Sequence, residues 1–353
     1  MTEKPEVRVE PPSLLVIHTG GTLCMRPGPD GLTPAGDFEP RLRRALRERP
    51  PARRATLPDF DWLEIDPLID SSAANPGHWQ ELAAHIAQAY DDYAGFVILH
   101  GTDTLSWTAA SLAYQLQGIG KPVVLTGAML PLETPNSDAL VNVEGALRFA
   151  QQECLKEVAL FFAGKLFRGV RARKWHSHQA DAFISPNYPP LGEIVDNQAI
   201  LFSGRGLHEQ QRCAPRFELA DYRALNETPV ARLVLWPGIA AWQLAAWLLD
   251  DRLQGAVLEL WGGGNIAQDQ ALLGVLAQAC GEGKVIVAIT QCFQGGIVSG
   301  AYAAGHGLAE AGVIAGDDMT PEAAFTKLLH LLALPLTDQE RRQRFLLGWV
   351  GER

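Results

Sequence analysis

The sequence predicts an α/β protein with two domains, and three observations point to this class. The chain has 353 residues, of which 47% are hydrophobic, enough for a large core and more than one domain. Short β-branched and aliphatic runs alternate with stretches of helical periodicity. Several of these runs are apolar throughout, as expected of parallel strands buried on both faces. We therefore expect a larger N-terminal domain with a mainly parallel sheet flanked by helices, and a smaller C-terminal, flavodoxin-like α/β domain with a parallel sheet.

The individual elements follow from the same patterns in chain order. Residues 1–12 are polar and proline-bearing without the features of a secretory signal, so we expect a flexible tail. Helical patterns cover residues 77–93 and 136–155, and Asn136 or Ser137 is expected to cap the second. The predicted strands are residues 14–18, 96–100, 123–126, 158–163, 232–236, 256–261 and 285–290.

A domain boundary is expected where the periodicity weakens. Residues 206–229 lie between two series of strands and helices, and we interpret them as a linker. The predicted domains are then residues 13–205 and 230–353.

The basic stretch 41–54 is expected to be a solvated helix face and loop.

Charge and cysteine content favour a small-molecule partner. The 30 basic and 40 acidic residues give a net charge of −10, which opposes non-specific binding to nucleic acid or an anionic membrane. No stretch approaches the roughly 20 apolar residues that span a bilayer. The five cysteines show no CxxC spacing of a zinc or redox site, and a reducing cytoplasm fits them best; they are Cys24, Cys154, Cys213, Cys280 and Cys292.

Two predicted strands end in motifs rich in glycine and threonine. The first is TGGT at residues 19–22, and the second is HGTDT at 100–104. In open α/β sheets, ligands bind beyond the carboxyl ends of strands, where glycines permit close approach and hydroxyls can donate, accept or attack. The structural alternative is a turn with helix-capping threonines. A phosphate-binding loop does not fit, because TGGT matches neither glycine-rich phosphate motif.

A threonine nucleophile needs a partner that takes its proton. Asp103 follows Thr102, and the loop expected after strand 158–163 carries Arg171, Arg173 and Lys174. A lysine held by a carboxylate can accept a proton from a hydroxyl, as in Ser-Lys variants of the catalytic triad. Spacing alone leaves open whether Lys174 reaches Thr102.

Taken together, these motifs resemble the bacterial-type L-asparaginase family, which has two catalytic threonines. The resemblance runs from residue 13 to 334, and the lack of a signal peptide is similar to the cytoplasmic type I branch. The matching segments are TGGTL, HGTDT, an R-x-x-K ending at Lys174, LTGAMLP, SPNYPPLG, GGGN and GDDMTPEAAFTKL.

The resemblance implies roles for individual residues. Thr22 would be the nucleophile, and Thr102, Asp103 and Lys174 a relay that activates either Thr22 or the deacylating water. The substrate-binding positions would be Asp70, Ser71, Ser72, Asp103, Ala128 and, from a neighbouring subunit, Asn265.

The implied reaction is hydrolysis of L-asparagine to L-aspartate and ammonia through a β-aspartyl-threonine ester. A weaker glutaminase activity stays open. The resemblance implies no metal or organic cofactor, and a homodimer or a homotetramer built from dimers.

One departure from the family concerns the lid after the nucleophile. The family's lid tyrosine is missing, and Leu32 lies near its place. We expect Tyr302 to take over its role in catalysis. Residues 24–37 contain glycine and proline and are expected to form a mobile loop.

Several other residues have structural interpretations. His176 and His178 could bind a metal, but no third ligand is evident, so we expect surface histidines. His100 is expected to be a buried supporting residue rather than a general base. Cys24 and Cys292 are expected to be packing residues.

Trp175 and Trp261 are expected to be core or interface anchors.

Two other functions remain open. An amidase subunit for tRNA-dependent transamidation would ordinarily need an extra N-terminal domain. A catalytically silent amino-acid sensor would be expected to lack at least one of the relay residues or Thr22, and all are present.

Overall fold

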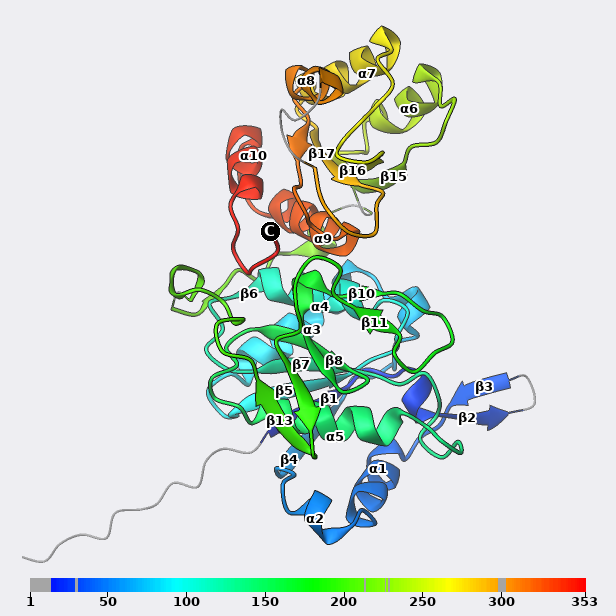
Figure 1. Cartoon of the computed structure of the whole chain (residues 1–353), viewed down its shortest axis with the longest axis vertical. Coiled ribbons are helices and arrows are strands. Elements are labelled where there is room, and N and C mark those ends of the chain that lie inside the picture. The colour runs from blue at the N-terminus through cyan, green and yellow to red at the C-terminus, as the bar shows by residue number, and fades with distance from the viewer. Residues whose placement is uncertain (1–13, 29–30, 213, 226, 228, 298–302) are drawn as a thin grey trace, which may run out of the picture.

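The computed structural model describes residues 14–28, 31–212, 214–225, 227, 229–297 and 303–353 (Figure 1). The expected tail and Tyr302 lie outside these residues. The described part contains an eight-stranded sheet in its N-terminal half and a four-stranded sheet in its C-terminal half. The predicted α/β class is confirmed.

The larger sheet has a parallel part and an antiparallel part. Strands β4, β1, β5, β7 and β8 are parallel neighbours, and β9, β12 and β13 extend the sheet in antiparallel pairs. The bounds are β1 (Leu14–His18), β4 (Phe60–Glu64), β5 (Gly95–Leu99), β7 (Val123–Thr126), β8 (Val158–Phe162), β9 (Lys165–Arg168), β12 (Gly192–Val195) and β13 (Gln198–Leu201).

Successive residues of each strand point to opposite sides of the sheet, and helices cover both faces of its parallel part. In β1, Leu15 and Ile17 join one hydrophobic cluster, whereas Leu14 and Val16 join the other. Helices α3 (Pro76–Gln88) and α4 (Leu105–Gln115) supply the first cluster, and α1 (Phe38–Arg47) and α5 (Ala139–Ala150) supply the second. This packing fixes the carboxyl ends of β1 and β5 side by side.

The smaller sheet is parallel throughout, in the order β15-β16-β17-β18. Helix α9 lies between the two sheets in Figure 1, and its Leu328 belongs to the same hydrophobic cluster as Leu112 of α4. The bounds are β15 (Val230–Val234), β16 (Gly255–Leu260), β17 (Val285–Thr290), β18 (Ile314–Ala315), α6 (Ala241–Leu248), α7 (Gln270–Gly281), α8 (Ala303–Glu310), α9 (Pro321–Ala333) and α10 (Asp338–Leu346).

Some local expectations are wrong. Helix α5 begins at Ala139 with Asp138 at the N-cap position. The Asp138 carboxylate makes no capping hydrogen bond and instead accepts the backbone N–H groups of Met129 and Leu130. The Ser137 hydroxyl accepts the Ala139 N–H at 3.1 Å, but neither Asn136 nor Ser137 occupies the cap position.

Two segments expected to be loops form short ribbons instead. In the segment 24–37, β2 (Met25–Gly28) pairs with β3 (Gly31–Pro34). The segment with the candidate lysine forms β10 (Arg173–Lys174), which pairs with β11 (Phe183–Ile184). In both segments, backbone hydrogen bonds between two short strands give regular structure. The local composition did not predict this pairing.

The basic stretch 41–54 is also less solvated than expected. It forms most of α1 and the short α2 (Pro51–Arg54). Arg41 is buried and ion-paired with Glu133 at 2.6 Å, and Arg49 forms an ion pair with the buried carboxylate of Glu144. A buried carboxylate is stable only with such partners, which explains why arginines of this stretch point inward.

The expected linker 206–229 contains a third short ribbon. Its strand β14 (Arg216–Phe217) pairs with β6 (Leu116–Gln117), which follows α4. This segment therefore contacts the N-terminal half before the chain enters β15.

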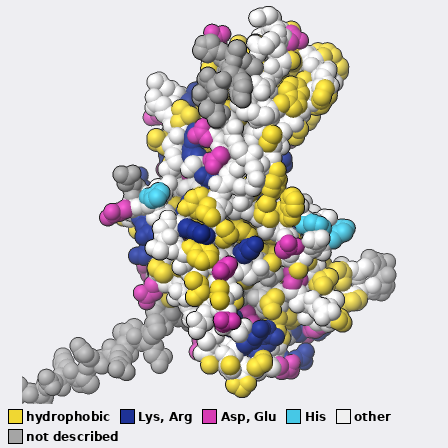
Figure 2. Space-filling model, in the orientation of Figure 1, with side chains coloured by type: hydrophobic (Ala, Val, Ile, Leu, Met, Phe, Trp, Pro, Cys, Tyr) yellow, Lys and Arg dark blue, Asp and Glu magenta, His cyan; other side chains and the backbone are white. Residues whose placement is uncertain are grey.

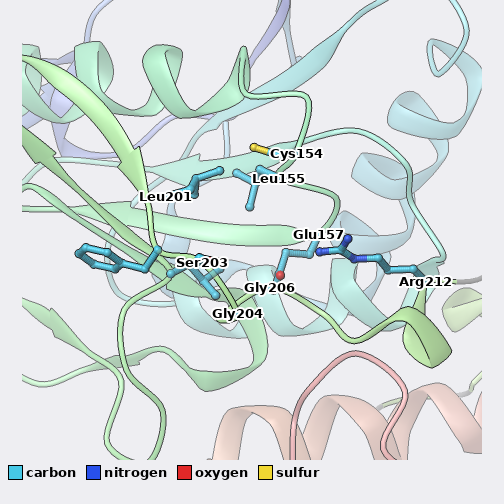
Figure 3. Close-up of a pocket in the computed structure, with 10 residues that line it drawn as sticks. Cys154, Leu155, Glu157, Leu201, Ser203, Gly204, Gly206 and Arg212 are labelled. Carbon is cyan, nitrogen blue, oxygen red and sulfur yellow. The ribbon is translucent and has the colours of Figure 1, made fainter.

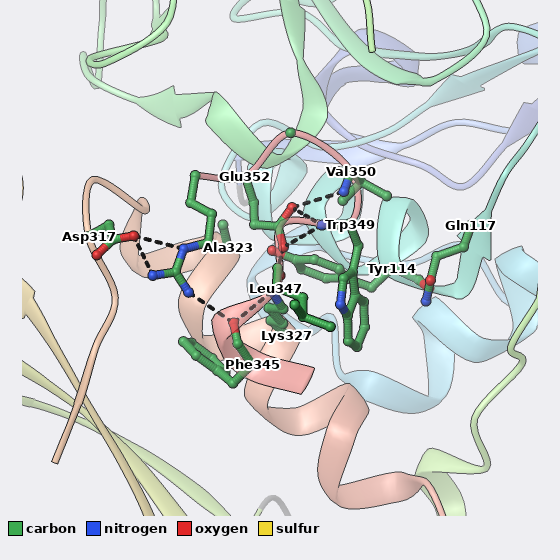
Figure 4. A network of polar contacts seen from close by, with 12 residues as sticks. Tyr114, Gln117, Asp317, Ala323, Lys327, Phe345, Leu347, Trp349, Val350 and Glu352 are labelled. Atoms are coloured by element: carbon green, nitrogen blue, oxygen red, sulfur yellow. Dashed lines mark hydrogen bonds and ion pairs between the residues drawn. The ribbon is translucent and has the colours of Figure 1, made fainter. Parts of the chain in front are cut away.

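The end of the chain is held in the interior by a polar network (Figure 4). Lys327 and Glu352 form an ion pair whose side chains are both 0% exposed. The Lys327 ammonium also donates to Phe345 O at 2.9 Å, and the Glu352 carboxylate accepts the Val350 N–H at 2.9 Å. Burial lowers the pKa of Lys327 to about 8, against the opposing effect of the Glu352 carboxylate. The network ties the C-terminal residues to α9.

The surface carries mixed charges. Figure 2 shows acidic, basic and hydrophobic side chains interspersed on one face, rather than a continuous basic stripe there. Within the described part of the chain, none of the helices combines the length and apolar character needed to cross a bilayer.

Candidate active site

The TGGT and HGTDT motifs meet at the carboxyl edge of the larger sheet. Thr19 follows β1, and both its backbone N–H and its hydroxyl donate to Leu99 O, at 2.9 and 3.0 Å. The carbonyl of Thr19 accepts the Ile69 N–H at 2.7 Å. Thr19 is therefore a buried structural residue that fastens three segments together.

Close glycine contacts bring these segments to van der Waals distance. Gly21 has a φ of +96°, and a Cβ atom there would lie 2.5 Å from Gly101 Cα. A Cβ atom on Gly101 would lie 2.4 Å from Ser71 Oγ. Thr22, half-buried at the start of a 3₁₀ helix (Thr22–Cys24), is thereby held beside the second motif. Only glycine fits these positions without displacing the backbone.

We predict that Gly21→Ala destabilises the protein more than Gly31→Ala. Both glycines have a positive φ, +96° and +111°, but nothing lies within 4 Å of a Cβ atom at Gly31. The steric clash at Gly21 should cost about 1–3 kcal/mol beyond the backbone strain shared by both variants. Denaturant unfolding measures the difference, and equal losses in the two variants would contradict the close packing of Gly21 on Gly101.

A hydroxyl, an ammonium and a carboxylate converge beside these glycines. The Lys174 ammonium donates to Thr102 Oγ1 at 2.9 Å and to Asp103 Oδ1 at 2.7 Å. Thr102 is 7% exposed, whereas the Asp103 side chain is 60% exposed. Topology thus brings Lys174, from the β10–β11 ribbon, to the end of β5. The Thr102 end of the cluster is shielded, and the Asp103 end faces solvent.

The expected substrate-binding segments lie around this cluster. Asp70 caps the 3₁₀ helix Ser71–Ala73 by accepting the Ser72 N–H at 2.9 Å. The Thr104 hydroxyl donates to Ser71 O at 2.7 Å, which links this turn to the HGTDT motif. Asp70 and Ser72 are exposed, while Ser71 is buried.

Ala128 is buried just beyond β7, and its neighbours are held from α5. Asn142 donates to Gly127 O at 3.0 Å, and Asp138 accepts the Met129 N–H at 2.9 Å. Sequence reasoning missed Asp138 and Asn142. Their signal is the spacing of two polar residues, four apart, on the buried side of the helix that follows LTGAM.

Two expected residues are not joined to the cluster. Asn265 lies beyond β16, where its backbone N–H donates to Trp261 O at 2.8 Å. Among the described residues, no hydrogen bond or ion pair links Asn265 to Thr102, Asp103 or Lys174. Tyr302 lies outside the residues that the structure describes.

The nearby histidine and cysteine are poorly suited to catalysis. Burial lowers the pKa of His100 to about 4, so the ring is neutral near pH 7. His100 Nδ1 lies 2.7 Å from Gly101 O, and Nε2 lies 3.1 Å from the Thr108 hydroxyl. Burial raises the pKa of the Cys24 thiol to about 11, and Sγ donates to Gly21 O at 3.1 Å. Both residues support the backbone of the motifs.

Three residues outside the cluster, Cys292, Trp175 and His176, also carried expectations from the sequence. Cys292 is exposed, so the expectation that it packs in the interior is wrong. Trp175 is also exposed and contacts Phe293 in a tilted arrangement with ring centroids 5.2 Å apart. His176 Nδ1 accepts the backbone N–H of His178 at 3.1 Å. In the described ranges, no three histidine, cysteine or carboxylate side chains are grouped as a metal site would need.

A separate cavity lies elsewhere in the N-terminal half (Figure 3). Its volume is about 230 Å³, and it lies among residues preceding β8 and following β13, with Leu155, Leu201 and Arg212 in its wall. Its buried carboxylate, Glu157, is already ion-paired with Arg168 at 2.7 Å. None of the threonine-motif residues lines this cavity, so we do not assign it to the candidate active site.

Fold and site together define a two-domain α/β protein with a threonine–lysine–aspartate cluster at the carboxyl edge of its larger sheet. The family model "Asparaginase, N-terminal" matches residues 13–205, and "Glutaminase/Asparaginase C-terminal domain" matches residues 229–345. The chain belongs to the asparaginase family.

Individual relatives agree with this assignment. L-asparaginase 1 of Escherichia coli K12 is 38% identical over 344 residues, which cover 96% of this chain and 97% of that protein. The crystal structure of L-asparaginase I from Vibrio cholerae has a TM-score of 0.86 and 36% identity, and the match covers 97% of this chain and 99% of that one. The thermostable L-asparaginase from Thermococcus kodakarensis has a TM-score of 0.84 and 31% identity, with 96% of this chain and 98% of that one covered.

Proposed function

We propose that this protein is an L-asparagine amidohydrolase, which converts L-asparagine to L-aspartate and ammonia. The observation that carries the proposal is the contact of Lys174 Nζ with Thr102 Oγ1 at 2.9 Å and with Asp103 Oδ1 at 2.7 Å. In its neutral form, the lysine can accept a proton through Thr102, and Asp103 stabilises the ammonium that results. Membership of the asparaginase family and the similarity to L-asparaginases support asparagine as the substrate.

The proposed reaction has two acyl-transfer steps. The Thr22 hydroxyl attacks the side-chain amide carbon and loses its proton to the relay. The C–N bond then breaks, the nitrogen takes up a proton, and ammonia leaves a β-aspartyl ester on Thr22. Water attacks this ester, the C–O bond to Thr22 breaks, and aspartate is released. Backbone N–H groups near the glycine pair would stabilise the oxyanion, at about 2.7–4 kcal/mol per donor.

The substrate would be held by the segments around the cluster. Asp70, Ser71 and Ser72 would bind its α-amino and α-carboxylate groups together with Asp103, and the backbone at Ala128 would contact the side-chain amide. These assignments rest on the resemblance and on the position of the Ser71 turn against the HGTDT motif. The residues of the chain supply this chemistry without a metal or organic cofactor in the proposed scheme.

We also infer a homodimer, or a homotetramer of dimers, in which Asn265 of the neighbouring subunit completes the site. Among the described residues of one chain, no hydrogen bond or ion pair joins Asn265 to the cluster, which is consistent with this inference. A cytoplasmic location is inferred from the resemblance to the type I branch, and the free thiols of Cys24, Cys154, Cys280 and Cys292 fit a reducing compartment.

The direct test is ammonia release from L-asparagine and L-glutamine by the purified protein. We expect ammonia and aspartate in equal amounts from asparagine, and less ammonia from glutamine. Saturable asparagine binding without ammonia would instead indicate the silent sensor, and activity that appears only with a co-purified partner or tRNA would indicate the transamidation role.

Tyr302→Phe is expected to lower kcat/KM for asparagine by roughly 10–100-fold, because a phenol that transfers a proton loses that ability when its hydroxyl is removed. The matched control is Tyr93→Phe. Tyr93 lies in the loop before β5, and its hydroxyl donates to Asp61 at 3.0 Å. An unchanged kcat/KM in Tyr302→Phe would exclude the expected role.

A further inference from the structure

The two sides of the strand that carries Lys174 contact different parts of the chain. The Lys174 side chain points to Thr102 and Asp103, whereas both of its neighbours contact the C-terminal half of the chain. Arg173 Nε lies 3.3 Å from Glu322 Oε2, and the Trp175 ring contacts that of Phe293 with centroids 5.2 Å apart. This alternation is expected of an extended strand, in which successive side chains point to opposite sides.

The ribbon around Lys174 is too short to fix the lysine by itself. Its strands β10 and β11 pair over only two residues each, Arg173 with Ile184 and Lys174 with Phe183. A two-stranded ribbon of this length has little independent stability. The position of the ammonium therefore depends on what packs against the ribbon.

Helix α9 supplies that support through its first turn. Glu322 is the second residue of α9. Thr320 caps this helix, because its hydroxyl accepts the Ala323 N–H at 3.1 Å. The same hydroxyl donates to Val170 O at 3.5 Å, just before β10. Thr320 and Glu322 thus contact the segment that leads into Lys174 at two points.

The next turn of α9 also contacts helix α4, which follows Thr102 and Asp103. Phe325 packs edge-on against Trp107 with ring centroids 5.4 Å apart. Trp107 lies in the first turn of α4, which begins directly after the HGTDT motif. Helix α9 therefore bridges the two sides of the contact between Lys174 and Thr102.

The pair of Arg173 and Glu322 is poorly explained by stability alone. Both Arg173 Nε and Glu322 Oε2 are buried, and neither has a hydrogen-bond partner in the described part of the chain. Burial raises the pKa of Glu322, and the guanidinium of Arg173 opposes this. A buried pair with incomplete hydrogen bonding is often no more stable than packed apolar side chains. Because this ion pair lies next to Lys174 in the strand, its role is better explained by the position that it gives to the strand.

We propose that Glu322 is a positioning residue for Lys174: through Arg173 it fixes the β10 strand, and with it the distance from the Lys174 ammonium to Thr102. The role rests on the proposed function, because Lys174 is the proton acceptor there. Glu322 itself does not touch the substrate. The C-terminal half of the same chain thereby sets the geometry of the relay in the N-terminal half.

Glu322→Gln tests the proposal, because the side chain keeps its size and loses its charge. We expect kcat for asparagine to fall roughly tenfold, since a displacement of about 1 Å in a catalytic group can slow the chemical step by up to about 100-fold. KM should stay within about twofold, because the segments proposed to bind the substrate are untouched. The matched control is Glu157→Gln, another buried glutamate ion-paired with an arginine, Arg168 at 2.7 Å, away from the relay. Its kcat should equal that of wild type, with the folding of both variants followed by thermal unfolding.

Two further measurements separate positioning from general stability. In a Lys174→Met background, Glu322→Gln should reduce the remaining rate no further, yet lower Tm as much as it does in wild type. Lys174 can also be observed without activity, by NMR of the protein with ¹³C-methylated lysines, with Lys174→Met identifying its signal. Glu322→Gln should change the chemical shift of that signal.

An unchanged kcat and an unchanged Lys174 signal in Glu322→Gln would overturn the proposal. So would an equal further loss of rate in the Lys174→Met background. The failure of the proposed function is distinguishable from these results. It would appear as a wild-type protein that releases no ammonia from asparagine, while the NMR signal of Lys174 still reports on the effect of Glu322→Gln.

Discussion

Thr22→Ala is expected to abolish ammonia release from L-asparagine. Removing the nucleophile of a hydrolase that works through an acyl-enzyme typically lowers kcat by roughly 10⁴–10⁶-fold. The side chain is half-buried at the start of a short 3₁₀ helix, so the truncation should leave the fold intact. The measurement is initial ammonia release at saturating asparagine, together with Tm.

Two variants serve as controls for Thr22→Ala. Thr22→Ser keeps a hydroxyl and should retain measurable turnover. Thr19→Val changes the other threonine of the same motif, whose hydroxyl donates to Leu99 O at 3.0 Å. It should lose about 1 kcal/mol of stability, as expected for one hydrogen bond, and keep most of its kcat. Turnover in Thr22→Ala comparable to that of wild type would show that another residue is the nucleophile.

Lys174→Met is expected to lower kcat by roughly 10²–10⁴-fold, the usual contribution of general acid–base catalysis. Methionine keeps an unbranched stem but lacks the amine, so it cannot accept a proton or donate to Thr102 and Asp103. The Lys174 side chain is 21% exposed, so we expect little loss of stability. The control is Lys165→Met, an exposed lysine on β9.

The time course of Lys174→Met also shows which step the relay serves. A rapid release of one ammonia per active site, followed by slow turnover, would mean that Lys174 activates the deacylating water. A slow rate from the start would mean that it activates Thr22. A rate equal to that of wild type would contradict any role of Lys174 in proton transfer.

Much of the fold could be predicted from the sequence, because its central strands are continuous apolar runs. The strands predicted at 14–18, 123–126 and 285–290 have the observed bounds, and the other four are displaced by at most two residues. Strand β4, with the sequence FDWLE, was missed because it lies at the sheet edge and mixes polar with apolar residues. The antiparallel strands β9, β12 and β13 were missed for a similar reason, since each has four residues and weak patterning.

The candidate site was predictable only in part. Thr22, Thr102 and Asp103 stand directly after apolar strands, where the topology of a parallel sheet gathers functional groups. The approach of Lys174 depends on the β10–β11 ribbon, and its support depends on Glu322 of α9, far along the chain. Such contacts arise from tertiary packing between distant segments, for which local composition carries no signal. The same holds for the arginines that pair with the buried carboxylate of Glu144.

The most direct test of the account is to locate the acyl group during turnover. Wild type and Lys174→Met are mixed with L-asparagine, quenched in acid, digested and mapped by mass spectrometry. The account predicts an aspartyl ester on the peptide that contains Thr22, in at least one of the two proteins, and on no other residue. An ester on Thr102, or ammonia release without an adduct in either protein, would contradict the assignment of Thr22 as the nucleophile.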